Sequence, residues 1–451
     1  MSEVITAVER RAIVSLASLY AFRMLGLFMV LPVLMLYGEH YEASTPLLLG
    51  MALGAYGFSQ AILQIPFGSL SDRVGRKPVI IIGLLIFAMG SVVAAMAESI
   101  YGLILGRALQ GAGAIAGAIM ALVADVTQDQ NRTKAMASIG ASIGVSFSVA
   151  LVLGPALAKI GGMQAIFTMT AALAAVGLVI VWRWVPTPMA TARRHRDTGT
   201  VPELVGQIAR IGELQRLNFG VFVLHAVLMA SFVAMPLVLE QNLAVGRDDH
   251  WLVYLPLLIL AFVAMVPFII IAEKQRKMKG VFISAVALLA TSEVALACFI
   301  DVRWAFFVAL FFFFIAFNLL EATLPSLMSK IAPAGAKGTA SGIYSTCQFL
   351  GAFVGGVGGG WLLQEFTFSG VFIGAAVMLL LWLLIAQNMK SPKHLTLVKV
   401  PVSLDEVDRV DEFLSALPGV AEVIIIEDEA TAYLKVDDRE FDQQSIENRD
   451  W

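Results

Sequence analysis

The chain has 451 residues, of which 59% are hydrophobic and 14% are charged, whereas about 25% of the residues of a soluble domain are charged. This composition excludes an ordinary soluble domain and predicts a protein that crosses a lipid bilayer many times. The net charge of −3 provides no basic surface, so we expect no nucleic-acid partner.

Apolar runs that are long enough to form transmembrane helices follow one another along the chain. They cover residues 12–37, 46–70, 79–97, 100–126, 134–158, 163–185, 217–241, 251–272, 281–300, 304–329, 338–364 and 368–389. The fold class that this pattern predicts is an all-α membrane protein with 12 transmembrane helices.

Lysine and arginine residues gather in the loops on one side of the predicted bundle. Cytoplasmic loops of membrane proteins are rich in these cations, so we expect this side, and both chain termini with it, to be cytoplasmic. The loops on this side contain Arg10, Arg11, Arg73, Arg76, Lys77, Arg132, Lys134, Arg193, Arg194, Arg196, Lys274, Arg276, Lys277 and Lys279. The opposite loops contain few cations, chiefly Lys159, Arg247 and Arg303.

The turn between the second and third predicted spans, residues 68–77, reads GSLSDRVGRK. Asp72 and Arg76 are four residues apart, so one helical turn would bring their charges together. Gly68 and Gly75 permit close packing and a sharp reversal of the chain. The cations of the turn are Arg73, Arg76 and Lys77. A simple connector needs fewer features than these, although a topology anchor with helix-capping charges is an alternative interpretation.

Residues 186–216 form the longest polar stretch inside the chain. We expect a cytoplasmic linker there, with a surface helix near 201–213. The linker divides an N-terminal six-helix half, residues 1–185, from a C-terminal six-helix half, residues 217–390.

The two halves resemble each other in sequence, which favours duplication of a six-helix unit. The segment PFGSLSDR of the first half is matched by PFIIIAEK in the second. In this alignment Glu273 corresponds to Asp72 and Lys277 corresponds to Arg76, so the second half keeps the charge pattern and loses the glycines.

After Lys390 the long apolar runs give way to short segments with alternating hydrophobicity. Strands are predicted at 395–402, 421–428 and 431–437, and helices at 404–416 and 438–449. The order β-α-β-β-α predicts a small cytoplasmic α+β domain of the ferredoxin-like type over residues 395–451, with its final strand missing or very short.

These features together resemble the major facilitator superfamily over roughly residues 10–390. The turn at 68–77 matches the superfamily signature G-x-L-[SA]-D-R-x-G-R-[RK] without a departure. The segment LGRALQGAGA around Arg107, and the glycines of the fifth span, resemble the drug/proton antiporter branch. With the C-terminal domain added, the chain resembles the YajR-type transporters, a small group of the bacterial inner membrane.

The resemblance implies a proton-coupled secondary transporter that exports small amphipathic compounds by alternating access. The sequence contains no nucleotide-binding P-loop, catalytic triad or metal-ligand cluster, so we expect no enzyme activity, no metal and no cofactor, with the proton gradient as the energy source. The expected partners are a small-molecule substrate, protons and the lipid bilayer. The C-terminal domain is a candidate binder of a ligand, a protein or the transporter core. Two alternatives stay open: a membrane sensor or assembly platform that signals through this domain, and a proton-coupled importer of a metabolite.

The resemblance also implies a gating latch at the turn. Asp125, at the cytoplasmic end of the fourth span, would join Arg76 in a charge cluster that holds the halves closed on the cytoplasmic side. The residues expected in the latch are Gly68, Asp72, Arg73, Gly75, Arg76 and Asp125.

Spans one, four, seven and ten line the central cavity in this superfamily. The residues that they would place around it are Arg23, Arg107, His225, Asn318 and Glu321. Glu321 is the leading candidate proton carrier, because a low-dielectric cavity favours the neutral form of a carboxyl group. His225 is its rival, because an imidazole titrates near neutral pH. The alternative is a fixed Arg–Glu321 pair beside a hydrogen-bonded histidine. Glu293, on the peripheral ninth span, has no assigned role.

Glycines recur at helical spacing in the fifth and eleventh spans, where they would let helix backbones approach closely. The residues expected in this interface packing are Gly140, Gly144, Gly154, Pro155, Gly351, Gly355 and Gly359. Pro155 removes a backbone donor and should bend the fifth span. The resemblance adds that this bend seals the interface between the halves against proton leak.

Overall fold

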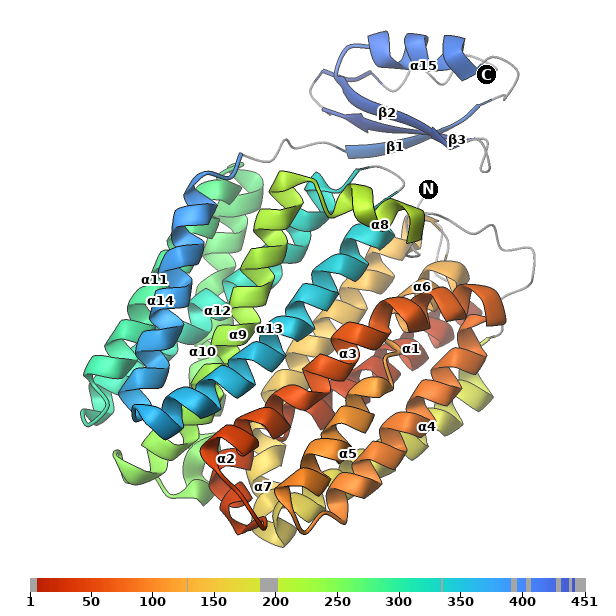
Figure 1. Cartoon of the computed structure of the whole chain (residues 1–451). Helices are drawn as coiled ribbons and strands as arrows, with labels where there is room; N and C mark the ends of the chain where they lie inside the picture. The colour runs from red at the N-terminus through yellow and green to blue at the C-terminus, as the bar shows by residue number, and fades with distance from the viewer. Residues whose placement is uncertain are drawn as a thin grey trace.

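The computed structural model describes residues 6–127, 129–186, 202–333, 336–390, 396–402, 407–426, 431–437 and 440–442. Long helices lie side by side in a bundle, and a small sheet with one helix lies beyond one end of it (Figure 1). We call this end of the bundle the domain end. The opposite end, where the short helix α2 (Leu34–Tyr37) lies, is the far end.

The helices fall into two halves on either side of a short helix, α8 (Pro202–Ile208). The N-terminal half contains α1 (Ala7–Phe28), α2, the 3-10 turn η1 (Gly38–His40), α3 (Pro46–Val74), α4 (Arg76–Ala95), α5 (Ile100–Ala112), α6 (Ala116–Val126) and α7 (Asp129–Trp184). The C-terminal half contains α9 (Gly212–Gln241), the 3-10 turn η2 (Arg247–Asp249), α10 (His250–Lys274), α11 (Met278–Cys298), α12 (Arg303–Ile331), α13 (Lys337–Glu365) and α14 (Phe368–Gln387).

These helices confirm the predicted all-α membrane fold. Across the described ranges, 11 helical stretches are long and apolar enough to cross a membrane. One of them, Lys134–Trp184, has 51 residues, and its backbone leaves the helical region at Gly161 and Gly162. It therefore contains both the fifth and the sixth predicted spans. The linker cations Arg193, Arg194 and Arg196 lie outside the described residues.

The segment 68–77 is helical rather than a loop, which corrects the prediction made for it. Helix α3 continues to Val74 and α4 begins at Arg76, so only Gly75 separates them. Gly75 has a φ of 108°, a value that side chains with a Cβ atom rarely adopt. A single glycine therefore reverses the chain, and the charges of this segment lie on the last turn of α3 and the first turn of α4.

The two halves contact each other closely at the far end. A Cβ atom added to Gly356 of α13 would lie 2.6 Å from the carbonyl oxygen of Gly50 in α3. Lys159 Nζ lies 3.1 Å from Asp248 Oδ2, and the Arg247 guanidinium donates to the carbonyl oxygen of Leu36 at 3.3 Å. These contacts all join the N-terminal half to the C-terminal half, so this conformation is closed at the far end.

This closure can be tested with a bulky residue at the closest backbone contact. Gly356→Leu is expected to push α3 and α13 apart, because overpacking costs about 1–3 kcal/mol, which corresponds to roughly a 5- to 150-fold shift between two conformations. The rate of disulfide formation in a Lys159→Cys/Asp248→Cys protein measures the shift and should fall.

Gly358→Leu is the matched control, since a Cβ atom at Gly358 of the same helix meets no atom within 4 Å. Equal rates of disulfide formation in the Gly356→Leu and Gly358→Leu proteins would contradict closure through this contact.

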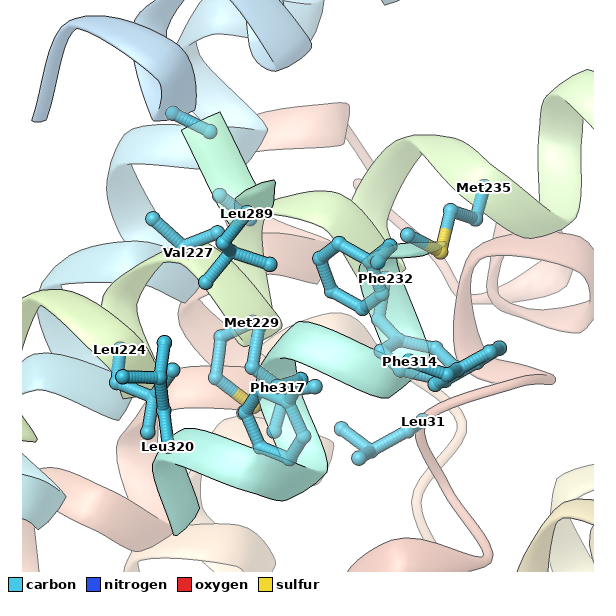
Figure 2. Close-up of a cluster of buried hydrophobic side chains, with 14 of the residues drawn as sticks. Leu31, Leu224, Val227, Met229, Phe232, Met235, Leu289, Phe314, Phe317 and Leu320 are labelled. Atoms are coloured by element: carbon cyan, nitrogen blue, oxygen red, sulfur yellow. The ribbon is translucent and has the colours of Figure 1, made fainter. Parts of the chain in front are cut away.

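The largest hydrophobic core crosses from one half to the other. Phe232 of α9 and Phe314 and Phe317 of α12 form its centre (Figure 2). Leu31, which lies between α1 and α2, packs into the same cluster. Inside a bilayer such contacts stabilise through van der Waals packing rather than through removal of apolar surface from water.

Glycines of α13 provide the close helix packing that the sequence predicts. A Cβ atom on Gly351 would lie 2.1 Å from the carbonyl oxygen of Phe222, and one on Gly355 would lie 2.0 Å from that of Ala226. Two further glycines meet backbone in the same way: Gly359 at Ala230 and Gly154 at Met29. Helices α13 and α9 therefore touch along their backbones.

The same prediction is wrong for the other two glycines of the fifth span in this conformation. A Cβ atom at Gly140 would meet no atom within 4 Å, and one at Gly144 would meet the Phe262 ring at 3.7 Å. Both positions have room for a side chain. Helix α7 also continues through Pro155, and its backbone becomes non-helical at Gly161 and Gly162, where two adjacent residues lack the Cβ atom that restricts φ.

The C-terminal domain contains β1 (Thr396–Pro401), α15 (Val407–Ala416), β2 (Val420–Ile426) and β3 (Thr431–Val436). The strand order is β1-β3-β2, and both pairings are antiparallel, as in the first β-α-β-β part of a ferredoxin-like fold. Val410 and Leu414 of α15 pack with Leu434 of β3. The predicted helix at 438–449 falls almost wholly on residues that the structure leaves undescribed.

Candidate functional site

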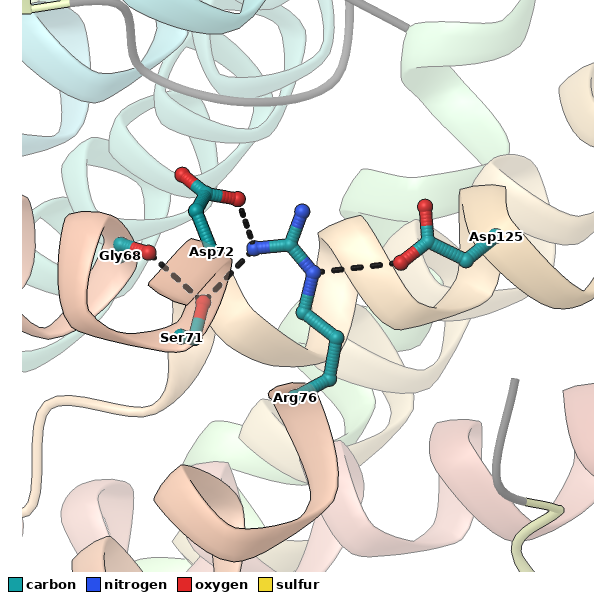
Figure 3. Close-up of polar contacts among 5 residues, drawn as sticks. All are labelled: Gly68, Ser71, Asp72, Arg76 and Asp125. Atoms are coloured by element: carbon teal, nitrogen blue, oxygen red, sulfur yellow. Dashed lines mark hydrogen bonds and ion pairs between the residues drawn. The ribbon is translucent and has the colours of Figure 1, made fainter. Parts of the chain in front are cut away.

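Arg76 is the centre of a polar cluster at the domain end (Figure 3). Its guanidinium forms an ion pair with Asp72, and its Nε donates to Asp125 Oδ2 at 3.2 Å. Its Nη1 also donates to Ser71 Oγ at 2.7 Å, and Ser71 Oγ donates to the Gly68 carbonyl oxygen at 2.7 Å. The structure thus brings together four of the six residues expected in the latch, and adds Ser71.

The cluster joins three helix ends within the N-terminal half. Asp72 lies at the end of α3, Arg76 at the start of α4 and Asp125 at the end of α6. A cation at a helix N-terminus is unfavourable because of the helix dipole, and the two carboxylates offset that cost. The side chains are 11% exposed for Arg76, 25% for Asp72 and 18% for Asp125, so the pairs are more shielded than an exposed surface pair.

The remaining two latch candidates have different surroundings. Gly75 makes the chain reversal that lets Arg76 approach Asp72. Arg73 is exposed and follows Asp72 on the last turn of α3. A Cβ atom at Gly68 would meet no atom within 4 Å, so this glycine contributes its carbonyl oxygen rather than close packing.

The corresponding segment of the C-terminal half forms a different ion pair from the predicted one. Glu273 of α10 accepts from Lys330 Nζ of α12 at 2.8 Å and from Ser326 Oγ at 3.2 Å. The alignment suggested Lys277 as its partner, but α10 ends at Lys274, which places Lys277 beyond the helical turn that an i,i+4 pair needs. Glu273 therefore pairs with a charge two spans later, whereas Arg76 pairs with charges on the spans directly before and after its own.

A second polar cluster lies inside the N-terminal half, among apolar helices. Arg23 of α1 donates to Gln60 Oε1 of α3. Arg107 of α5 donates to Gln110 Oε1 at 2.8 Å and to the Ala52 carbonyl oxygen at 3.3 Å. Both cations lie over the Tyr56 ring, with its centroid 5.6 Å from the Arg23 guanidinium and 5.3 Å from that of Arg107. A π-face attracts cations, so Tyr56 holds both.

The two guanidinium groups of this cluster carry unused hydrogen-bonding capacity. Arg23 is 1% exposed and Arg107 is 0% exposed. Arg23 Nε and Nη1 and Arg107 Nη2 have no hydrogen-bond partner in the part of the chain that the structure describes. Buried cations without a carboxylate partner are costly in a membrane. The cluster can therefore bind water or an anionic group of a substrate, and it raises the electrostatic potential of the interior.

The histidine and the glutamate of the predicted cavity lie together in the C-terminal half. His225 Nδ1 donates to the Val221 carbonyl oxygen at 3.1 Å, and Nε2 accepts from Gln348 Nε2 at 2.8 Å. Because a carbonyl only accepts and an amide nitrogen only donates, these bonds suit a neutral imidazole. Glu321 Oε2 lies 3.6 Å from His225 Nε2 and has no hydrogen-bond partner among the described residues.

The clusters of the two halves lie within electrostatic reach of one another. Tyr20 of α1 lies within electrostatic range of both Arg23 and Glu321, and Tyr344 of α13 lies within range of Glu321. Asn318, one helical turn before Glu321, is 7% exposed. The five predicted cavity residues therefore occupy one region of the bundle interior, although Glu321 lies beside His225 rather than in an ion pair with an arginine.

The glutamines and the serine of this region were not predicted from the sequence. Gln60 donates to Gln64 Oε1 at 3.2 Å, and Gln110 donates to Ser91 Oγ at 2.8 Å. A signal for them exists in the sequence, because Gln60 and Gln64 are four residues apart in an apolar span and Gln110 follows Arg107 by three. Amides at helical spacing from a buried cation are candidates for its hydrogen-bond partners.

Comparison with known proteins gives consistent matches over most of the chain. The sequence matches the family model described as Major Facilitator Superfamily over residues 16–356 and 217–399. It is 45% identical over 441 residues to the inner membrane transport protein YajR of Escherichia coli (strain K12), a match that covers 97% of each chain. It is 26% identical over 344 residues to multidrug resistance protein MdtH of Aeromonas salmonicida (strain A449), covering 75% of this chain and 84% of that protein. A solved structure of a bacterial homolog of the human lysosomal transporter Spinster, inward-facing and occupied, superposes with a TM-score of 0.72 at 13% identity, covering 85% of this chain and 97% of that one.

Proposed function

The chain belongs to the major facilitator superfamily of secondary transporters, and on that premise we propose that it exports small amphipathic compounds across a bacterial inner membrane in exchange for protons. As a transporter it moves its substrate without converting it. The observation that carries the proposal is the group of ionisable side chains inside the bundle, Arg23 and Arg107 in one half and His225 with Glu321 in the other. Ionisable residues inside a membrane mark ion and substrate pathways.

The similarity to a protein named for multidrug resistance supports export of amphipathic compounds. The similarity to a protein named for inner membrane transport supports the location. The excess of cations at the domain end supports a cytoplasmic position for that end and for both termini. With this orientation, the far end is periplasmic, and the conformation closed there is the one that would receive substrate from the cytoplasm.

Alternating access in this proposal is a rocking of the two halves about the buried cluster. At the domain end, the ion pairs of Arg76 with Asp125 and of Glu273 with Lys330 each lie within one half. Those at the far end cross between halves, for example Lys159 with Asp248. Opening the far end therefore requires these cross-half contacts to break, while the clusters at the domain end can persist as rigid parts of each half.

A substrate screen in proteoliposomes tests the proposal. Purified full-length protein is reconstituted with a pH-sensitive dye inside the vesicles, and amphipathic compounds are added with and without an imposed pH gradient. Exchange predicts that a transported compound and protons move in opposite directions. Movement in the same direction would favour a proton-coupled importer, and binding of compounds without any flux would favour a sensor.

The C-terminal domain contacts the bundle, which favours a regulatory role for it within a working transporter. Lys435 Nζ of β3 donates to the Ala332 carbonyl oxygen at the end of α12 at 2.5 Å, and it forms an ion pair with Glu422 Oε2 at 3.2 Å. Lys435 is 7% exposed. A lysine buried in this way needs its partners, so the contact would constrain the connection between α12 and α13.

Removal of residues 395–451 is expected to leave substrate flux close to the wild-type rate, because the buried polar clusters lie wholly within the bundle. Flux in proteoliposomes is the measurement, and Lys435→Ala in the full chain separates loss of the contact from loss of the domain. If the truncated protein inserts and binds compounds but moves none of them, the sensor function replaces the accessory role.

A further inference from the structure

Glu293 of α11 is a buried carboxyl group that the proposed transport pathway does not use. It is 0% exposed, as is Ser231 of α9. Ser231 Oγ lies 2.6 Å from Glu293 Oε1 and 2.8 Å from the carbonyl oxygen of Val227. Glu293 Oε2 has no hydrogen-bond partner in the described part of the chain. The pair connects two helices, α9 and α11, through one short hydrogen bond.

The number of hydrogen atoms at Ser231 determines how this pair can bond. A serine hydroxyl carries one hydrogen, yet Ser231 Oγ has two oxygen neighbours at bonding distance, Glu293 Oε1 and the Val227 carbonyl. A carbonyl oxygen cannot donate. Both contacts are full two-centre hydrogen bonds, rather than two branches of one shared hydrogen, only if the carboxyl group supplies a hydrogen, so that Glu293 Oε1 donates to Ser231 Oγ and Ser231 Oγ donates to Val227.

The surroundings also favour the neutral form of Glu293. Val227 lies one turn before Ser231 on α9, and Leu289 lies one turn before Glu293 on α11; both belong to the apolar cluster of Figure 2, and both are 0% exposed. An ionised carboxylate with a single hydrogen bond and no cation is very costly in such a place.

Among the described residues, no charged side chain of the helices that pack against α11 pairs with Glu293. The sequence of α14 contains no ionisable side chain. On α12, Arg303 donates to the Leu243 carbonyl oxygen and Lys330 pairs with Glu273 of α10, while Glu321 lies beside His225 of α9. The remaining ionisable residues of α10 and α11 are His250, Tyr254, Lys274, Lys279 and Cys298, and within the described residues none of them forms a hydrogen bond or ion pair with Glu293.

We infer that Glu293 is a proton-binding site separate from the central cavity: it holds its proton on Oε1 and, as a carboxylic acid, joins α11 to α9. Oε2 is then a carbonyl oxygen that receives no hydrogen bond from the described residues. The same helix α9 carries His225 six residues earlier, so the bond fixes a cavity-lining helix against its peripheral neighbour. The site goes beyond the proposed transport function and does not depend on its direction or substrate.

Infrared spectroscopy of full-length protein in lipid nanodiscs at neutral pH tests the inference. The spectrum of wild type minus that of Glu293→Gln should contain a carboxylic-acid carbonyl band, at the high-frequency position of a carbonyl without a hydrogen-bond donor. Glu273→Gln is the matched control: Lys330 pairs with Glu273, so its difference spectrum should contain carboxylate bands instead. Carboxylate bands in the Glu293→Gln difference spectrum would overturn the inference.

Thermal unfolding in detergent provides a second measurement that does not rely on band assignment. Glu293→Gln keeps a donor, the side-chain amide, that can bond Ser231 Oγ, so its apparent Tm should stay near that of wild type. Glu293→Ala and Ser231→Ala lose the bond and should fall by roughly 1–4 °C. A fall in Glu293→Gln as large as that in Glu293→Ala would mean that a negative carboxylate is needed, and would also overturn the inference.

Discussion

Arg76→Ala is expected to lower the rate of substrate transport by about 5- to 150-fold while the protein still inserts and folds. The guanidinium of Arg76 connects Asp72 of α3 with Asp125 of α6 and donates to Ser71. Its loss leaves two carboxylates close together without a cation between them. A coupling of about 1–3 kcal/mol between the cluster and the rocking of the halves gives a change of this size. Initial rates in proteoliposomes, normalised to inserted protein, are the measurement.

Arg73→Ala is the matched control for this change. Arg73 carries the same charge and lies on the same turn of α3, but it is exposed, so its loss should change the rate little. The transport rate of Asp125→Asn should be lowered, as that of Arg76→Ala is, whereas the rate of Arg73→Ala should stay near the wild-type rate. Wild-type rates in both Arg76→Ala and Asp125→Asn would show that the cluster only anchors the topology.

The direction of the conformational shift is a further measurement on the same variants. The cluster is already formed in the conformation that is closed at the far end, so its loss shifts the equilibrium only by the difference in its strength between the two conformations. We propose that it is stronger when the domain end is closed. Disulfide formation between Lys159→Cys and Asp248→Cys should then become faster when Arg76→Ala is added.

The transmembrane fold follows from the sequence because the bilayer leaves few choices. A span must be helical, apolar and about 20 residues long, so the lengths of the apolar runs were enough to place the helices. The breaks within and between them were harder to predict. Gly75 reverses the chain in one residue, and the fifth and sixth spans, predicted to end at 158 and to begin at 163, are joined through non-helical backbone at Gly161 and Gly162. Such details depend on the local backbone and not on hydropathy.

The charged residues of the candidate site could be predicted from the sequence, but the groups that they contact could not. A buried arginine or glutamate in an apolar run is conspicuous, and Arg23, Arg107 and Glu321 all occupy the bundle interior or its margin. Which groups they contact depends on how helices from distant parts of the sequence pack. Sequence spacing therefore suggested an i,i+4 partner for Glu273, whereas Lys330 of a different helix binds it.

Glu321→Gln is expected to abolish the accumulation of substrate that a pH gradient drives. The variant should still exchange substrate across the membrane when no gradient is imposed. The Glu321 carboxyl group lies 3.6 Å from His225, in the same region as Arg23. Glutamine has nearly the same shape and cannot bind or release a proton. For each proton coupled, a gradient of one pH unit can drive about tenfold accumulation. In the variant the accumulation ratio should therefore fall to about one.

The comparison of three variants assigns the proton carrier. Glu321→Asp keeps a titratable group on α12 and should retain part of the gradient-driven accumulation. Glu365→Gln, an exposed change at the end of α13, controls for the loss of one negative charge and should behave as wild type. His225→Gln removes the neighbouring imidazole together with its hydrogen bonds to Val221 and Gln348. If His225→Gln loses gradient-driven accumulation and Glu321→Gln keeps it, the histidine carries the proton and the carboxylate only orients it.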